Sequence, residues 1–517
     1  MLLLRIAVES WLRDVGAWWR REWRTVLLLF CLQFAAFSYL YTIPILTNHT
    51  FEHVWLQDYP TYSTLTEGRW MSDLVIWAQG EAGVQSFQMI LATLVQACNG
   101  LLLADLVGEK RRAQRFLLAA LLCLYPAFID FYSFSNYHLA FVLGDAFALL
   151  AALALVRGAP SRAGLVLAGL GFVLAIASYQ PKLGLVALLL ASVALLRLTR
   201  AAPEDPRPTP AGVIRDLGTL LLVGVGSGVI YWLTMRLTVS EANPLRTNVN
   251  TLAAAWHQVQ VAYGETAHRF SRGIDGLSRL GHGTVLAILL VGVAGFAWDA
   301  GRRALWLVPV VLAVVAVIPV ALRATYVVND LAWARPGRIL YPFGYCLLFF
   351  LARGLKTRLV GVAVAIAGAG LLWSFLAFDT QQVNYAAFKS QRDLWWIGRI
   401  ADRVEPLASP KPGVAVPLVV VGHYPETPVG KFIRRPTDAI QLNTPAFEYY
   451  RQPTILNHFL GREAFRFPTA AELVRARATM LGRRPWPAPE SVYLADQIVV
   501  VILEEPTSET DMTLTKG

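Results

Sequence analysis

An isolated acid, Asp58, is the residue of this sequence best placed for acid–base chemistry. It follows the first long apolar run and lies among aromatic residues in the stretch 57-QDYPTYSTLTEGRWMSDLVIW-77. A carboxylate that is sheltered at a membrane boundary and oriented by hydrogen bonds can act as a general base towards a hydroxyl group. Asp is also a common amino-terminal cap, so capping of a short interfacial helix is the alternative role for Asp58.

Two arginines, Arg335 and Arg338, could bind a phosphate group. They lie on either side of Pro336 and Gly337. Pro336 restricts the backbone, and Gly337 allows it the freedom to turn. Arginine suits this task because its planar fork can hold two phosphate oxygens and stays charged near apolar surroundings. Alternatively, one of them pairs with Asp330 and the other snorkels to lipid headgroups.

The composition is that of a polytopic helical membrane protein. Of 517 residues, 56% are hydrophobic and 16% charged, and mean hydropathy is +0.47. The net charge of +11 comes from short basic clusters between apolar runs, as in cytoplasmic loops, so nucleic-acid binding is not expected. The four cysteines lie in or beside apolar runs without metal-ligand spacing, and we expect no metal site built on them.

The charge pattern predicts a multi-pass topology with the amino terminus inside. Residues 1–24 carry one apolar stripe among arginines, which predicts an interfacial amphipathic helix on the cytoplasmic leaflet. A transmembrane domain at 25–378 follows, with external loops at 47–85, 238–282 and 322–337, and each inferred cytoplasmic loop carries at least two basic residues. The eleven expected spans are 25–46, 86–107, 116–132, 137–156, 163–178, 183–196, 217–237, 283–298, 304–321, 338–352 and 359–378.

Residues 379–517 differ in character, because charges and prolines return there. The apolar runs 416–422 and 493–503 are short, β-rich and bounded by polar residues, as strands are, and 384–404 has helical spacing. We therefore expect a small extracytoplasmic α/β domain. The predicted fold class is mainly α, an integral membrane protein with this α/β domain at its end.

The candidate polar residues all fall on the external side of this topology. A substrate with a phosphate needs cations near the bilayer edge, and a lipid tail needs an apolar groove between helices. The chain has no Gly-rich βαβ unit for a nucleotide sugar, so a sugar donor would come from the membrane as a polyprenyl-phosphate sugar. The further residues of this external group are Arg69, Tyr179, Gln180, Lys182, Asn329 and Asp330.

Three of these residues have a structural alternative. Arg69 could snorkel or pair with a neighbouring acid, either Glu67 or Asp73. Tyr179 could belong to an aromatic belt, and Lys182 could anchor lipid headgroups.

The acid in the first external loop, the later Gly68-Arg69-Trp70 and the Tyr179-Gln180 pair at a helix end carry a resemblance to a known family. Together they resemble the polytopic glucosyltransferases that modify bacterial O-antigens in serotype conversion, within the GT-C superfamily. The resemblance covers the membrane region and thins over 379–517.

This resemblance implies transfer of glucose from undecaprenyl-phosphate-glucose to a lipopolysaccharide glycan, with inversion. It assigns Asp58 as the catalytic acid of the first loop and Arg69, Trp70, Tyr179 and Gln180 as motif positions. The family often has paired acids in that loop, whereas Gln57 precedes Asp58 here, which leaves metal dependence open. A lone carboxylate suits metal-free base catalysis, and we expect no cofactor.

The sequence therefore favours a glycosyltransferase of the bacterial inner membrane with a periplasmic carboxyl-terminal domain. Its expected partners are the lipid-linked donor, a glycan acceptor and membrane lipid, with a separate synthase and flippase supplying the donor. A non-catalytic transporter or lipid-linked sugar flippase is the alternative. The polar groups of a transporter or flippase should line the whole membrane depth, whereas the polar groups of this sequence gather on one side. Other sugars and acceptors also remain open.

Overall fold

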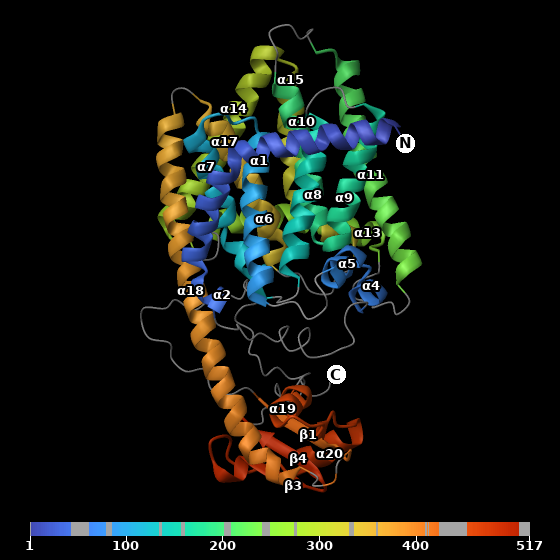
Figure 1. Ribbon diagram of the computed structural model, residues 1–517, viewed down its shortest axis with the longest axis vertical. Helices are drawn as coiled ribbons and strands as arrows, with labels where there is room; N and C mark the ends of the chain where they lie inside the picture. The colour runs from blue at the N-terminus through green and yellow to red at the C-terminus, as the bar shows by residue number, and fades with distance from the viewer. Residues whose placement is uncertain are drawn as a thin grey trace. The chain divides into compact units, whose positions relative to one another are not determined.

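The computed structural model describes residues 2–42, 62–78, 85–133, 137–156, 161–200, 208–239, 249–272, 277–329, 336–357, 360–408, 411, 413–422 and 452–505. The protein is mainly helical and forms two compact units (Figure 1). One unit holds most of the chain up to Val383, and the other holds most of the chain from Asn384 onward.

The first unit is a helical bundle in which α8 packs against α6, α9 and α10. The elements up to residue 200 are α1 (Leu2–Ala36), α2 (Ser38–Thr42), α4 (Tyr62–Glu67), α5 (Trp70–Ala78), α6 (Gln85–Leu106), α7 (Arg112–Cys123), η1 (Pro126–Ser133), α8 (His138–Val156), α9 (Arg162–Ser178) and α10 (Lys182–Thr199). Those that follow are α11 (Pro210–Thr238), α13 (Leu252–Arg272), α14 (Arg279–Arg303), α15 (Leu307–Leu322), α16 (Ala324–Val328), α17 (Pro336–Leu355) and α18 (Gly361–Val404).

Six helices of the described chain are long and apolar enough to cross a membrane, and three shorter apolar helices accompany them. The shorter ones are Arg162–Ser178, Leu307–Leu322 and Tyr341–Leu355. The span expected at 116–132 is wrong as a single helix, because α7 ends at Cys123 and the chain continues as the 3-10 helix η1 from Pro126. Proline has no backbone N–H to continue an α-helical ladder, which explains the break.

The amino-terminal prediction of two helices, 1–24 and 25–46, is corrected to one continuous α1. In Figure 1 the first part of α1 runs across the bundle and the rest runs along it. A hydrogen bond and an ion pair fix the helix, since Trp18 donates from Nε1 to Asp105 at 2.9 Å and Arg115 pairs with Glu22 at 2.8 Å. Arg115 also pairs with Asp105 at 2.6 Å, so these groups tie α1 to α6 and α7.

The span predicted at 359–378 and the helical segment at 384–404 form one helix, α18. No Pro or Gly interrupts residues 379–384, where polar residues begin, so helical hydrogen bonding continues through them. Asp379, which we took as the start of a separate domain, therefore lies inside this helix.

A buried ionic network joins three helices of the bundle. The ammonium of Lys182, at the start of α10, donates to Asp145 of α8 and, at 2.9 Å, to the hydroxyl of Tyr341 of α17. Asp145 also accepts from Tyr341 and, at 3.0 Å, from Tyr345. The side chains of Lys182 and Asp145 are 0% and 1% exposed, so each charge depends on these partners.

The carboxyl-terminal unit contains a four-stranded sheet in the order β2-β1-β4-β3. The strands are β1 (Val416–Val421), β2 (Phe465–Arg466), β3 (Val492–Ala495) and β4 (Ile498–Ile502), and α19 (Gln452–Leu460) and α20 (Ala470–Ala478) accompany them. β1 is parallel to β2 and β4, while β3 pairs antiparallel with β4.

The run 493–503, predicted as one strand, forms a hairpin instead. Asp496 and Gln497 have φ angles of 46° and 63°, so the chain turns between β3 and β4. Two consecutive left-handed residues are typical of the tightest hairpin turns.

We predict that Lys182→Met strongly destabilises the bundle, by about 3–5 kcal/mol, because it leaves the Asp145 carboxylate buried without its cation. The double variant Lys182→Met/Asp145→Asn should recover most of this loss, since both charges are removed and Asn still accepts hydrogen bonds. Thermal unfolding in detergent measures the effect. Equal stability of Lys182→Met and the unaltered protein would show that the pair contributes nothing.

Candidate functional site

The short helices α4 and α5 form a compact turn around Gly68. Gly68 has φ +72°, and a Cβ added there would lie 2.5 Å from Cγ of Met235 in α11. Only glycine fits both the backbone conformation and this contact. Gly68 therefore lets the segment 62–78 pack directly against α11.

Asp73 of α5 fixes the position of α4. One carboxylate oxygen, Oδ2, accepts from the backbone N–H of Thr64 at 2.7 Å and from its hydroxyl at 2.5 Å. Among the described residues the other oxygen, Oδ1, has no hydrogen-bond partner. Burial raises the pKa of Asp73 to about 6, although the bonds from Thr64 and the charge of Arg69 act in the opposite direction.

Arg69 comes together with the adjacent residues Tyr179 and Gln180, which lie more than a hundred residues later in the sequence. Arg69 donates from Nε to Oε1 of Gln180 at 2.8 Å, and its guanidinium lies 4.8 Å from the ring centroid of Tyr179. The guanidinium also pairs with Glu67 at 2.7 Å. Of the two acids weighed as partners for Arg69, Glu67 forms the ion pair.

Gln180 completes this cluster, because its amide nitrogen donates to the backbone carbonyl of Glu67. Arg69 is 8% exposed and both Gln180 and Tyr179 are 7% exposed. A buried group that is already paired is better suited to holding the backbone in place than to meeting a substrate. The cluster, which we call the Gln180 junction (Glu67, Arg69, Tyr179 and Gln180), joins the segment 62–78 to the turn before α10.

Two further contacts strengthen this attachment. Ser72 donates from its hydroxyl to the carbonyl of Ser178 in α9. Trp70, a predicted substrate-binding residue, donates from its indole nitrogen to the hydroxyl of Thr234 in α11 at 3.3 Å. Trp70 therefore anchors the segment in this structure.

Lys182 is adjacent in sequence to the junction but has a different environment. It is fully buried and bonded to Asp145, so it is not the exposed headgroup anchor that we weighed as an alternative. Asn329 lies at the end of α16, where it forms a backbone bridge with Val249. Asn250 reinforces this bridge, since its side-chain amide donates to the carbonyls of Tyr326 and Asn329 at 2.7 and 3.2 Å.

Several predicted site residues lie outside the described residues. These are Asp58, Asp330 and Arg335. Arg338 lies in the first turns of α17, and its side chain is likewise outside the description. Their roles stay predictions.

A long apolar groove begins beside the junction. It has a volume of about 940 Å³ and lies between α10, α11, α15 and α16. Gln180, Tyr231, Arg236 and Asn329 line it near one end. The rest of its lining is almost wholly aliphatic, as expected for a site that takes a hydrocarbon chain.

Arg236 is a residue that the sequence analysis missed. It lines the groove, and its guanidinium lies 5.2 Å from the centroid of a Trp232 ring. It falls within the expected span 217–237, and the sequence analysis gave it no role. The available signal was an arginine at the end of the span that the expected topology places outside, where the orientation rule predicts few cations.

The described residues contain no group of three His, Cys, Asp or Glu side chains that could hold a metal ion. Asp58 and its neighbours are not among them, so metal dependence stays open.

We predict that stability falls as pH rises through about 6, by up to about 3 kcal/mol for a shift of this size, because the folded state favours protonated Asp73. Stability from this group is therefore greatest below pH about 4. Asp73→Asn should abolish this dependence and keep the two bonds from Thr64. Asp73→Ala should lose those bonds, at about 1–3 kcal/mol. Unfolding midpoints between pH 4 and 8 test this, and an unchanged pH profile in Asp73→Asn would refute it.

Comparison with known proteins identifies the chain. The sequence profile of the family described as Glucosyl transferase GtrII matches residues 56–350, which is more than half of the chain. This range includes Asp58, the Gln180 junction and the groove. No curated protein and no solved structure matches. The protein is a member of the GtrII glucosyl transferase family.

Proposed function

We propose that this protein transfers glucose from a polyprenyl-phosphate donor to a cell-surface glycan such as O-antigen, on the periplasmic side of the bacterial inner membrane. The observation that carries the proposal is the apolar groove beside the Gln180 junction. A nucleotide sugar would need a polar pocket for its base and ribose, whereas an aliphatic groove suits an isoprenoid tail. A separate synthase and flippase would supply the donor.

The phosphate of the donor would lie where the groove meets polar residues. Arg236 is the described cation on the groove lining there, and Arg335 and Arg338 follow the segment that ends at Asn329. Cations at this point stabilise the phosphate as negative charge develops on it. A guanidinium can hold two of its oxygens at once.

Asp58 would act as the general base. The acceptor hydroxyl loses its proton to Asp58, its oxygen forms a bond to the anomeric carbon, and the bond from that carbon to the phosphate oxygen breaks. Polyprenyl phosphate leaves, and attack from the face opposite to it inverts the anomeric configuration. The Gln180 junction supports this step indirectly, because it holds the segment 62–78 that immediately follows the Asp58 region.

A non-catalytic transporter or flippase is the alternative function. Membership of a glucosyl transferase family favours the enzyme. The decisive experiment supplies purified protein in nanodiscs with polyprenyl-phosphate glucose or UDP-glucose, together with a glycolipid acceptor. Transfer from the lipid-linked donor supports the proposal, and transfer from UDP-glucose alone contradicts it.

We predict that Asp58→Asn lowers the transfer rate by about 10²–10⁴-fold, because the amide keeps the size of the carboxylate but cannot accept the proton. A capping role predicts little change, since Asn caps a helix about as well as Asp. Single-turnover transfer with saturating donor measures the rate. A near-normal rate in Asp58→Asn would end the assignment of Asp58 as base.

We predict that Arg236→Gln, Arg335→Ala and Arg338→Ala each weaken donor binding by about tenfold to a hundredfold, the range of one lost charge-assisted hydrogen bond. Arg→Lys should restore only part of the affinity, because an ammonium cannot hold two oxygens in a planar fork. Arg215→Gln, an exposed arginine at the other end of α11, is the matched control. Donor titration of the folded variants tests this, and wild-type affinity in all three would place the phosphate elsewhere.

A further inference from the structure

The groove is about as long as a membrane is thick. On α11 its lining residues run from Leu217 to Arg236, which is about 28 Å at about 1.5 Å per residue. The hydrocarbon core of a bilayer is about 30 Å thick. The lining of α10 covers part of this length, from Leu183 to Ala194.

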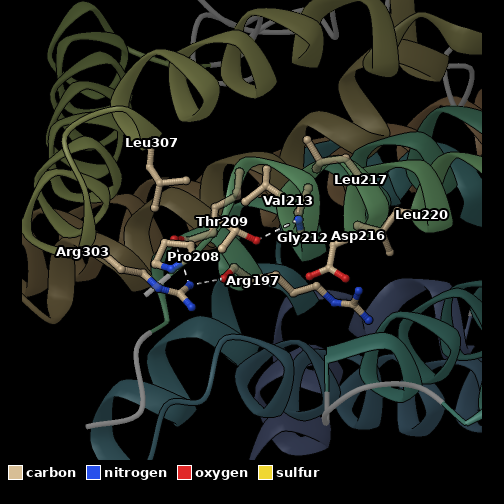
Figure 2. Close-up of a pocket in the computed structure, with 12 residues that line it drawn as sticks. Arg197, Pro208, Thr209, Gly212, Val213, Asp216, Leu217, Leu220, Arg303 and Leu307 are labelled. Carbon is tan, nitrogen blue, oxygen red and sulfur yellow. Dashed lines mark hydrogen bonds between the residues drawn. The ribbon is translucent and has the colours of Figure 1, made fainter. Parts of the chain in front are cut away.

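A pocket that contains charged side chains lies at the end of this apolar surface. It has a volume of about 260 Å³ and shares Ala194, Leu217 and Leu220 with the groove. Figure 2 shows its polar residues, among them Arg303 and Asp216. Arg303 donates to the carbonyl of Arg197 at 2.8 Å. A hydrocarbon chain that follows the groove from Arg236 therefore meets charged groups once it passes Leu217.

Two glycines of α11 lie in the middle of the groove. Gly224 and Gly228 both line it. A Cβ at Gly224 would lie 2.6 Å from Cδ1 of Leu190, whereas a Cβ at Gly228 would meet nothing within 4 Å. Gly228 therefore borders open space in the groove, into which a larger side chain would extend.

We infer that the groove encloses the donor's tail in one direction and over a fixed length, an inference that rests on the proposed donor. The phosphate end lies at Arg236, and the enclosed part of the tail ends at Leu217 and Leu220. Each isoprene unit adds four main-chain bonds, which advance an extended zigzag chain by about 5 Å in total, so about five or six units fit in about 28 Å. Units beyond this number lie outside the groove. The enzyme therefore distinguishes a donor that fills the groove from a shorter one and ignores additional length.

The position of the tail is the sharpest test of this inference. A tail leaving lipid gains little from hydrophobic transfer, because lipid is already apolar, and its affinity reflects packing in the groove. Donors carrying a photoreactive diazirine in the first or the fifth isoprene unit are bound to the unaltered protein in nanodiscs, and labelled peptides are mapped. We expect the first to label near Tyr231 and Met235, and the fifth near Ala194, Leu217 and Leu220. Labels that coincide, or that lie outside the groove, would overturn the inference.

Gly228→Leu tests the same inference from the side of the protein. It should reduce labelling by the fifth-unit probe, and transfer from a full-length donor, by about tenfold, because the leucine occupies space that the tail would take. Transfer from a two-unit donor should not change. Gly226→Leu is the matched control: it lies on the same helix, its Cβ also meets nothing within 4 Å, and it does not line the groove. Equal effects of both variants would contradict the inference.

The outcomes separate this inference from the proposed function. If the unaltered protein transfers glucose from no polyprenyl-phosphate donor of any length, the proposed function fails. If it transfers equally well from two-unit and full-length donors, and the probes do not label the groove, the proposed donor stands and only the fixed length fails.

Discussion

The amide side chain of Gln180 forms hydrogen bonds with two different residues and so holds the proposed site together. Gln180 accepts from the guanidinium of Arg69 with its oxygen and donates to the backbone of Glu67 with its nitrogen. All three residues are buried, so each unsatisfied group would be costly and the arrangement has little freedom. The segment that follows Asp58 is therefore attached to the turn between α9 and α10, and Gln180 of this turn also lines one end of the groove.

The same turn is held from its other side by the Lys182 network. Lys182 lies two residues after Gln180 and binds Asp145 and Tyr341. Tyr341 lies in the same helix as Arg338, so the network connects the junction to the helix that carries a candidate phosphate ligand. Thr325 adds a third contact, since its hydroxyl donates to the carbonyl of Pro181 at 3.3 Å. In the proposed function, positioning and substrate binding are thus divided between buried paired residues and the lining of the groove.

Local patterns predicted the individual elements well. Apolar runs of bilayer length became α6, α8, α10, α11 and α14, and the β-rich run at 416–422 became β1, because side-chain periodicity and burial act over a few residues. The errors in predicted elements occur where individual residues interrupt the pattern of a helix or a strand. Pro126 ended the expected helix at 116–132, and the left-handed Asp496 and Gln497 divided one expected strand into a hairpin. In contrast, the polar residues after Phe378 did not end α18, since none of them blocks helical hydrogen bonding.

The sequence alone determined the helical membrane character, the glucosyltransferase resemblance and the choice of Arg69, Tyr179 and Gln180, because composition and short motifs are visible in one dimension. It left open whether Arg69 pairs with Glu67 or Asp73 and whether Lys182 meets lipid. Only the tertiary structure decided these points, since they depend on which of several charged groups folding brings within a few ångströms. The groove and Arg236 also emerged only from the fold, because a cavity between four helices has no signature in any one of them.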